Sequence, residues 1–182
     1  ASYFVKKHIG QPIYEALTVE IDFSMGAAVY DWISAAWAGN YQRKNGSIIS
    51  FDSKFEAISE QEFFNALITE TTFPACDGAS KNPAYISVKF APEYTRMKKG
   101  GGKVASAGKG GQKQWSPANF MLQIDGLDCS KVSKVDSFTV RQIAQTDELG
   151  AGRDYEKVPG KLEFPNLTIT LPEAGTQTWQ AW

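Results

Sequence analysis

The sequence predicts a mainly β protein: a β-rich α+β fold, arranged as an antiparallel β-sandwich or barrel with one flanking amphipathic helix. Two observations predict this class. Apolar and polar residues alternate over residues 17–24, and the same alternation recurs at residues 120–124 and 167–171. Strands send successive side chains to opposite faces, so each stretch would bury one face of a sheet. One helical pattern, over residues 25–37, accompanies them.

Length and charge limit the possible classes of protein. The chain has 182 residues, which suits a single domain over residues 1–182. A chain of this size buries roughly 70% of the surface that its unfolded form exposes. The formal net charge is −1, so we expect neither specific nucleic-acid binding nor attraction to a membrane surface. No apolar run approaches the roughly 20 residues that a membrane-spanning helix needs.

The first elements are a strand and a helix. Residues 16–24 form the expected strand, and the Ser24 hydroxyl is a candidate N-cap for the helix that follows. Gly39 and Asn40 are typical of a helix C-terminus. The apolar stripe of this helix includes Trp32 and Trp37, which we therefore expect in the core.

Residues 41–73 predict a hairpin and then a strand. Asn45-Gly46 tolerates the positive φ angles of a tight turn, so we expect a hairpin between residues 41–44 and 47–51. Residues 59–62 fit a helix capping box, while residues 68–73 are β-branched and sheet-prone. The prediction is a short helical turn followed by a strand that ends at Pro74.

The second half of the chain predicts more strands separated by loops. We expect strands at residues 85–90, 120–124, 133–142 and 162–171. Val135, Phe138 and Val140 are the expected core contacts of the third of these. Residues 144–160 are polar and contain glycine, which predicts a loop.

A glycine- and lysine-rich segment covers residues 98–114. Dense glycine carries a large ordering cost, so we expect a loop within the domain that becomes ordered on assembly. The spacing does not fit a phosphate-binding loop, which needs two glycines five residues apart and then Lys and Ser or Thr. The lysines that we expect to contact a neighbouring subunit are Lys98, Lys99, Lys103, Lys109 and Lys113.

Residues with catalytic or metal-binding chemistry are few. His8 is the only histidine, and Cys76 and Cys129 are far apart in the sequence, which gives no zinc-binding pattern. We expect two reduced thiols, no cofactor and no enzyme activity. Carboxylate pairs such as Asp125 and Asp128 are expected by chance in any chain with 20 acidic residues.

Three tryptophans outside the helix leave a second function open. Trp115, Trp179 and Trp182 would suit a carbohydrate-binding β-sandwich if they formed an exposed stacking surface. Alternatively, the aromatic residues at the end of the chain would be covered by a partner or by further sequence. Two explanations stay open: the natural chain continues past residue 182, or a partner covers this end, in which case Trp179 and Trp182 are assembly contacts.

Five blocks of sequence are informative when taken in order: residues 28–33, 65–74, 83–93, 122–127 and 162–167. In that order they resemble the tail-tube protein family of contractile-tailed phages and phage-tail-like injection systems. The resemblance covers roughly residues 15–182.

The resemblance implies a structural protein of a virion tail or tail-like particle, made in the bacterial cytoplasm. Members of this family form homo-oligomeric, typically hexameric rings that stack into a tube inside a contractile sheath, and they have no active site. Expected partners are further copies of the chain, then sheath and baseplate proteins, with the genome passing through the lumen. A role in the baseplate or in tail completion is an alternative.

Overall fold

The fold is mainly β, with antiparallel pairing throughout. The computed structural model describes residues 10, 12–105, 115–147 and 156–182. Its elements in chain order are β1 (Leu17–Ile21), α1 (Ala27–Trp37), β2 (Lys44–Phe51), β3 (Ala57–Phe73), β4 (Cys76–Asp77), β5 (Ile86–Ala91), β6 (Tyr94–Lys99), β7 (Lys134–Val135), β8 (Phe138–Asp147), β9 (Glu156–Glu163), β10 (Ile169–Thr170) and α2 (Gln177–Gln180). A 3₁₀ turn, η1 (Glu173–Gly175), precedes α2. The predicted class, with one flanking amphipathic helix, is confirmed.

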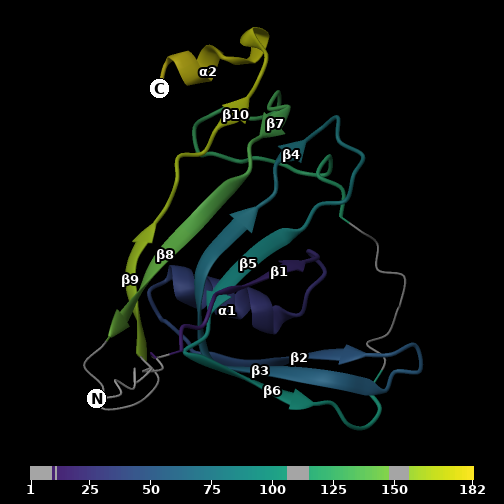
Figure 1. Ribbon diagram of the computed structural model, residues 1–182. Helices are drawn as coiled ribbons and strands as arrows, with labels where there is room; N and C mark the ends of the chain where they lie inside the picture. The colour runs from purple at the N-terminus through teal and green to yellow at the C-terminus, as the bar shows by residue number, and fades with distance from the viewer. Residues whose placement is uncertain (1–9, 11, 106–114, 148–155) are drawn as a thin grey trace, which may run out of the picture.

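The strands form two sheets. The larger has the order β1-β5-β3-β8-β9, and β2 and β6 pair with β3 outside this path. The smaller sheet has the order β10-β7-β4 and lies toward the end of the molecule that carries α2 (Figure 1). Helix α1 packs against one face of the larger sheet (Figure 1).

The core lies between α1 and the larger sheet. Ile86, Val88 and Phe90 alternate along β5, so all three side chains reach the face that α1 covers. Ile33 and Ala36 meet them from the helix. The alternation in β1 serves the same core, because Leu17, Val19 and Ile21 pack at its border. The strand expected at residues 16–24 is confirmed as β1, but it is shorter than predicted and ends at Ile21.

Strand β3 is long, and its two halves pair with different strands. Residues 67–73 pair with β5 and β8 in the body of the molecule. Residues 57–64 pair instead with β2 on one side and β6 on the other. Three segments, β2, residues 57–64 of β3, and β6, project from the body and form the arm (Figure 1).

The predicted hairpin turn at Asn45-Gly46 is wrong, because both residues lie inside β2. The Asn45 side chain instead accepts a hydrogen bond from the Asn65 backbone N–H (2.8 Å). Gly46 lies against a ring, and a Cβ there would be 2.4 Å from Cζ of Phe63. The turn lies further on, where the Asp52 N–H donates to the Glu56 carbonyl (3.0 Å).

The start and end of α1 test two further predictions. Ser24 is not the N-cap: that position is Gly26, without a side-chain cap. The Ser24 N–H donates to the Asp22 carboxylate (2.8 Å), which shapes the turn after β1. The C-terminal prediction is confirmed. Gly39 has a φ of 77°, and the Asn40 N–H donates to the Ala35 carbonyl (2.9 Å).

The helical turn predicted within residues 59–73 is also wrong, since β3 is a strand throughout. Residues 57–64 pair with β2 on one side and β6 on the other. The hydrogen bonds of these two ladders outweigh the local preference of the capping pattern for a helix. The predicted strand at residues 85–90 is confirmed as β5, with a shift of one residue.

Four predictions for the second half need correction. Residues 120–124 join no strand, and only Ile124 makes an isolated bridge, to Leu127. The strand predicted at 133–142 is split into β7 and β8, which pair with different sheets. The loop predicted at 144–160 contains the end of β8 and the start of β9, and the strand predicted at 162–171 is interrupted over residues 164–168. Pro159 is tolerated in β9 because β9 is an edge strand.

Candidate functional site

A row of polar side chains crosses the larger sheet on the face opposite α1. Residues that are directly paired in antiparallel strands share a face. The register therefore aligns one residue from each of five strands: Thr18, Lys89, Glu70, Arg141 and Glu163. Glu70 lies 3.7 Å from the Lys89 ammonium and 3.9 Å from the Arg141 guanidinium. The charges in this row alternate, so it is polar but close to neutral.

A second polar row runs beside the first. It contains Glu20, Ser87, Thr72 and Thr139, again paired strand to strand. The hydroxyls of Thr72 and Thr139 are hydrogen-bonded at 2.8 Å. The larger sheet thus has one apolar face under α1 and one hydrophilic face, and the hydrophilic face extends to the strands at both edges, β1 and β9.

The arm meets the body at a cluster of charged groups around Glu93, which we call the joint. The Glu93 carboxylate is 11% exposed and accepts hydrogen bonds from the Asn65 side-chain amide (2.6 Å) and the Lys157 backbone N–H (3.2 Å). The Arg43 guanidinium lies 3.5 Å from it and also contacts Glu156 (2.9 Å). Burial lowers the pKa of the Lys157 ammonium, although the nearby Glu93 acts in the opposite direction.

The joint holds a bend in β3. Asn65 has a φ of 52°, a left-handed conformation that strands do not adopt and that asparagine tolerates better than most residues. Its backbone N–H and its side chain are both hydrogen-bonded, to Asn45 and Glu93 respectively. These contacts fix the direction in which the arm leaves the body. On the arm side of the bend, the Phe64 and Tyr94 rings stack at 4.6 Å, with the Arg96 guanidinium over both.

Beyond the joint, the arm exposes apolar side chains on both faces. Ile48 and Met97 share one face with Gln61, whereas Ile49 lies on the other with Glu60. Met97 is 75% exposed and Ile58 is 60% exposed. Sheets are stable when at least one face packs on another layer. Among the described residues, no element covers either face of the outer arm.

The predicted assembly residues lie in two separate places. Lys98 and Lys99 are in β6 on the arm, and Lys103 pairs by a bridge with Glu56. The Lys98 ammonium contacts Glu62 (2.7 Å) and Glu60 (3.3 Å), and these carboxylates raise its pKa. Lys109 and Lys113 lie outside the described residues.

The predicted tryptophan contacts are at the other end of the molecule from the arm (Figure 1). The Trp179 indole N–H donates to the Asp128 carbonyl (2.9 Å), and Trp182 is 88% exposed. The Trp115 ring packs against Phe23, with the ring centroids 4.3 Å apart. Among the described residues, no ring contact joins these three tryptophans.

Groups suited to metal binding or proton transfer are sparse in the described part of the chain. No group of three or more His, Cys, Asp or Glu side chains there is placed to hold a metal ion. His8 lies outside the described residues. The helices that are described are all too short or too polar to cross a membrane.

Both cysteines carry free thiols and are half-buried. Burial raises the pKa of the Cys76 thiol above its ordinary value of 9.0. The unfolded chain therefore loses this proton first as the pH rises. The thiol's contribution to stability is complete well below the unfolded-state pKa, and it is lost as the pH rises from that value through the raised folded-state pKa.

We predict that Cys76, in a Cys129→Ser variant, titrates at a higher pH in the folded protein than in the same variant in urea. The measurement is the rate of alkylation by iodoacetamide as a function of pH, followed by intact-mass spectrometry. The midpoint of the profile reports the pKa, whereas its plateau also depends on access. Equal midpoints in the two states would contradict the assignment of the shift to burial.

No protein-family model matches this chain, and no curated protein or solved structure matches it either. The assignment of function therefore depends on the residues themselves.

Sequence reasoning missed the joint and the polar rows. Arg43, Glu93 and Lys157 are far apart in sequence and carry no motif. The alternation of apolar and polar residues in the strands gives a weak signal for the two polar rows. The polar positions of residues 17–21 and 86–91 are charged or hydroxylic, as expected for a face turned to water.

Proposed function

We propose that this protein is a structural subunit of a phage tail or a phage-tail-like contractile injection system, and that its copies assemble into the stacked rings of the tail tube. The observation that carries the proposal is the arm. Its outer part exposes apolar side chains on both faces, a surface that is costly in a lone molecule and useful in an assembly.

The edges of the larger sheet support the same proposal. Within the described residues, β1 pairs only with β5 and β9 only with β8. Each edge therefore offers backbone groups that no strand of the same molecule pairs, except at Lys157 of β9, whose N–H and carbonyl already bond to Glu93 and Arg43. A strand of a neighbouring subunit can pair with the remaining groups. A ring closes such edges on identical copies.

The hydrophilic face of the larger sheet suits the inner surface of a tube. If neighbouring sheets join edge to edge, the row that begins at Thr18 and ends at Glu163 becomes continuous around the ring. The alternation of Lys89, Glu70 and Arg141 keeps this surface wetted without a strong field of one sign. Such a lining would let a polymer pass without holding it.

Assembly of the purified chain tests the proposal. We expect the concentrated protein to form rings or tubes in negative-stain electron microscopy, and its mass by light scattering to rise with concentration. An apolar-to-polar change on the arm, Met97→Ser with Ile58→Ser, should reduce the assembly while leaving the circular dichroism spectrum unchanged. The matched control is Ile13→Ser, since Ile13 is 91% exposed and lies outside the arm. A protein that stays monomeric at millimolar concentration would overturn the proposal.

A further inference from the structure

Residues 120–124 have the sequence of a strand but no partner strand. Phe120, Leu122 and Ile124 alternate with Met121 and Gln123, yet the segment joins neither sheet. Among the described residues, the backbone N–H and carbonyl groups of Phe120–Gln123 make no hydrogen bond. Backbone polar groups in a folded protein are usually paired, so this segment is an unused strand position.

The segment is nevertheless held in place at both ends. Before it, the Trp115 indole N–H donates to the Asn119 carbonyl (3.2 Å). After it, the chain turns at Gly126, whose φ is 80°, and the Leu127 N–H donates to the Ile124 carbonyl (3.1 Å). The Asp128 N–H then donates to the hydroxyl of Thr178 in α2 (3.0 Å). A partner strand would therefore bind a segment that is already positioned.

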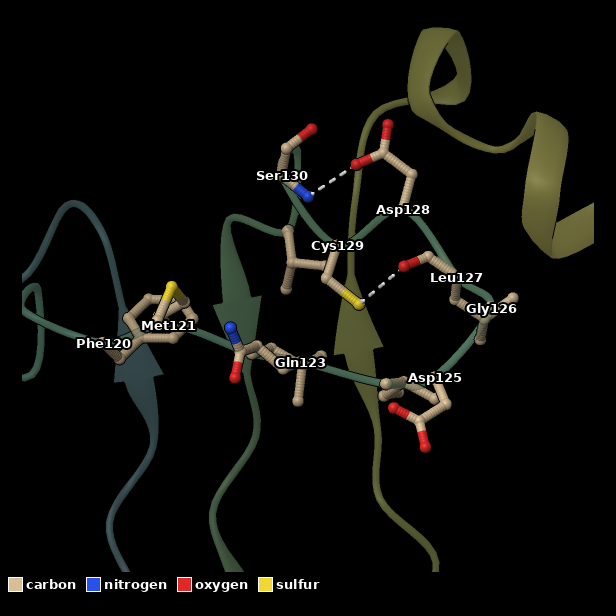
Figure 2. Close-up of a pocket in the computed structure, with 12 residues that line it drawn as sticks. Phe120, Met121, Gln123, Asp125, Gly126, Leu127, Asp128, Cys129 and Ser130 are labelled. Carbon is tan, nitrogen blue, oxygen red and sulfur yellow. Dashed lines mark hydrogen bonds between the residues drawn. The ribbon is translucent and has the colours of Figure 1, made fainter.

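There is space beside the segment. Figure 2 shows that the chain runs from Phe120 past Gln123 to Asp125, and then returns through Leu127 and Cys129. Between the two runs lies an open hollow of about 810 Å³. Met121 is 79% exposed, so apolar surface as well as free backbone is available there.

The charges favour one of the edge strands as the partner. Between Trp115 and Ser130 the chain contains Asp125 and Asp128 and no basic residue. β6 carries three cations and no acid, whereas β1 carries only Glu20 and β2 only Lys44. Lys98 of β6 already contacts Glu62 and Glu60, which leaves Arg96 and Lys99 without an ion pair among the described residues. β9 has no net charge, because two lysines offset two glutamates: Glu156, Lys157, Lys161 and Glu163.

The partner must come from another copy. Hydrogen bonds place residues 120–128 next to α2, and Figure 1 shows α2 and β6 at opposite ends of the molecule. β6 pairs with β3 along one edge, and in the described part of the chain its other edge is free. We propose that β6 of a second copy adds to residues 120–124 as a strand, with Arg96 and Lys99 near Asp125 and Asp128.

This contact rests on the proposed assembly and gives it a direction. One end of each subunit would bind the opposite end of the next, a head-to-tail contact that propagates along an axis instead of closing a pair. Backbone hydrogen bonds would supply the affinity, as in other cases of strand addition, and the charges would set the register.

A proline substitution isolates the backbone contribution. Met121→Pro removes an N–H that is unpaired in the single molecule, so the thermal midpoint and circular dichroism should not change. Association between copies should weaken at least about tenfold, because a ladder bond is lost and the ring obstructs pairing. Met121→Leu, which keeps the N–H, is the matched control. Association is measured by sedimentation velocity over a concentration series.

Cysteine pairs identify the partner strand. In a Cys76→Ser, Cys129→Ser background, Gln123→Cys is mixed with Lys99→Cys or with Thr18→Cys, and cross-linked dimers are read on a non-reducing gel. We expect a cross-link with Lys99→Cys in β6. A cross-link only with Thr18→Cys would assign the contact to β1 and overturn the inference. If the unmodified protein assembles and Met121→Pro assembles equally well, this inference fails while the proposed function stands. A protein that never assembles refutes both.

Discussion

Replacing Ile86 with alanine is expected to lower the free energy of unfolding by about 2–5 kcal/mol, the range for removing a large aliphatic side chain from a packed core. Ile86 is fully buried at the centre of the cluster between β5 and α1. The change removes transfer free energy and leaves a cavity that the sheet cannot fill, because β5 is held on both sides by β1 and β3. Urea denaturation followed by circular dichroism measures the loss.

The control for this prediction is the same substitution at an exposed isoleucine. Ile13→Ala should change the free energy of unfolding by less than about 0.5 kcal/mol, since Ile13 is 91% exposed. If Ile86→Ala does not fold, Ile86→Val should still fold with a loss of about 0.5–1.5 kcal/mol. Similar losses for Ile86→Ala and Ile13→Ala would contradict the position of the core.

Replacing Glu93 with alanine is expected to cost about 1.5–3 kcal/mol of stability, the range for hydrogen bonds to a charged group. The Asn65 amide and the Lys157 N–H would lose their acceptor, and Arg43 would lose one of its two carboxylate contacts. The bend at Asn65 would also lose its support. We therefore expect faster hydrogen exchange in residues 57–64, which hydrogen-exchange mass spectrometry resolves by peptide.

Two variants make the Glu93 prediction specific. Glu20→Ala removes an exposed carboxylate from β1 and should change stability by less than about 0.5 kcal/mol. Glu93→Gln keeps the shape of the side chain and loses its charge, so it should lie between Glu93→Ala and the unmodified protein. If exchange in the arm is unchanged in Glu93→Ala, the joint does not set the arm's direction.

Local sequence patterns predicted correctly those elements whose pattern follows from their own geometry. The alternation in residues 17–21 and the apolar stripe of α1 both read correctly, because each pattern follows from the geometry of its own element. Gly39 was also readable, since a helix end needs a residue that tolerates positive φ.

The errors arose where contacts distant in sequence outweigh local preference. Asn45-Gly46 has the composition of a turn, yet Asn65 and Phe63 use these residues for a side-chain hydrogen bond and a close approach. The real turn places Phe55 at a φ of 62°, a conformation that favours glycine or asparagine and not an aromatic residue. Composition therefore pointed away from it. Residues 120–124 have a strand pattern, but a strand also needs a neighbour, and the single molecule supplies none.

The candidate surfaces were less accessible to sequence reasoning than the fold. The resemblance and the lysines of residues 98–103 pointed to assembly, and the structure places these lysines on and next to the arm. The joint was not foreseen, because Glu93 meets Asn65 and Lys157 only after three strands have paired.

The amino-acid sequence alone determined that this protein is mainly β with one amphipathic helix, since the spacing of apolar residues is fixed by the repeat of each element. Only the tertiary structure decided that β3 bends at Asn65 and serves both the body and the arm. It also decided that charges from four strands form one row. The physical reason is that strand pairing and register are set by hydrogen bonds between distant segments, and no local pattern records which segments will meet.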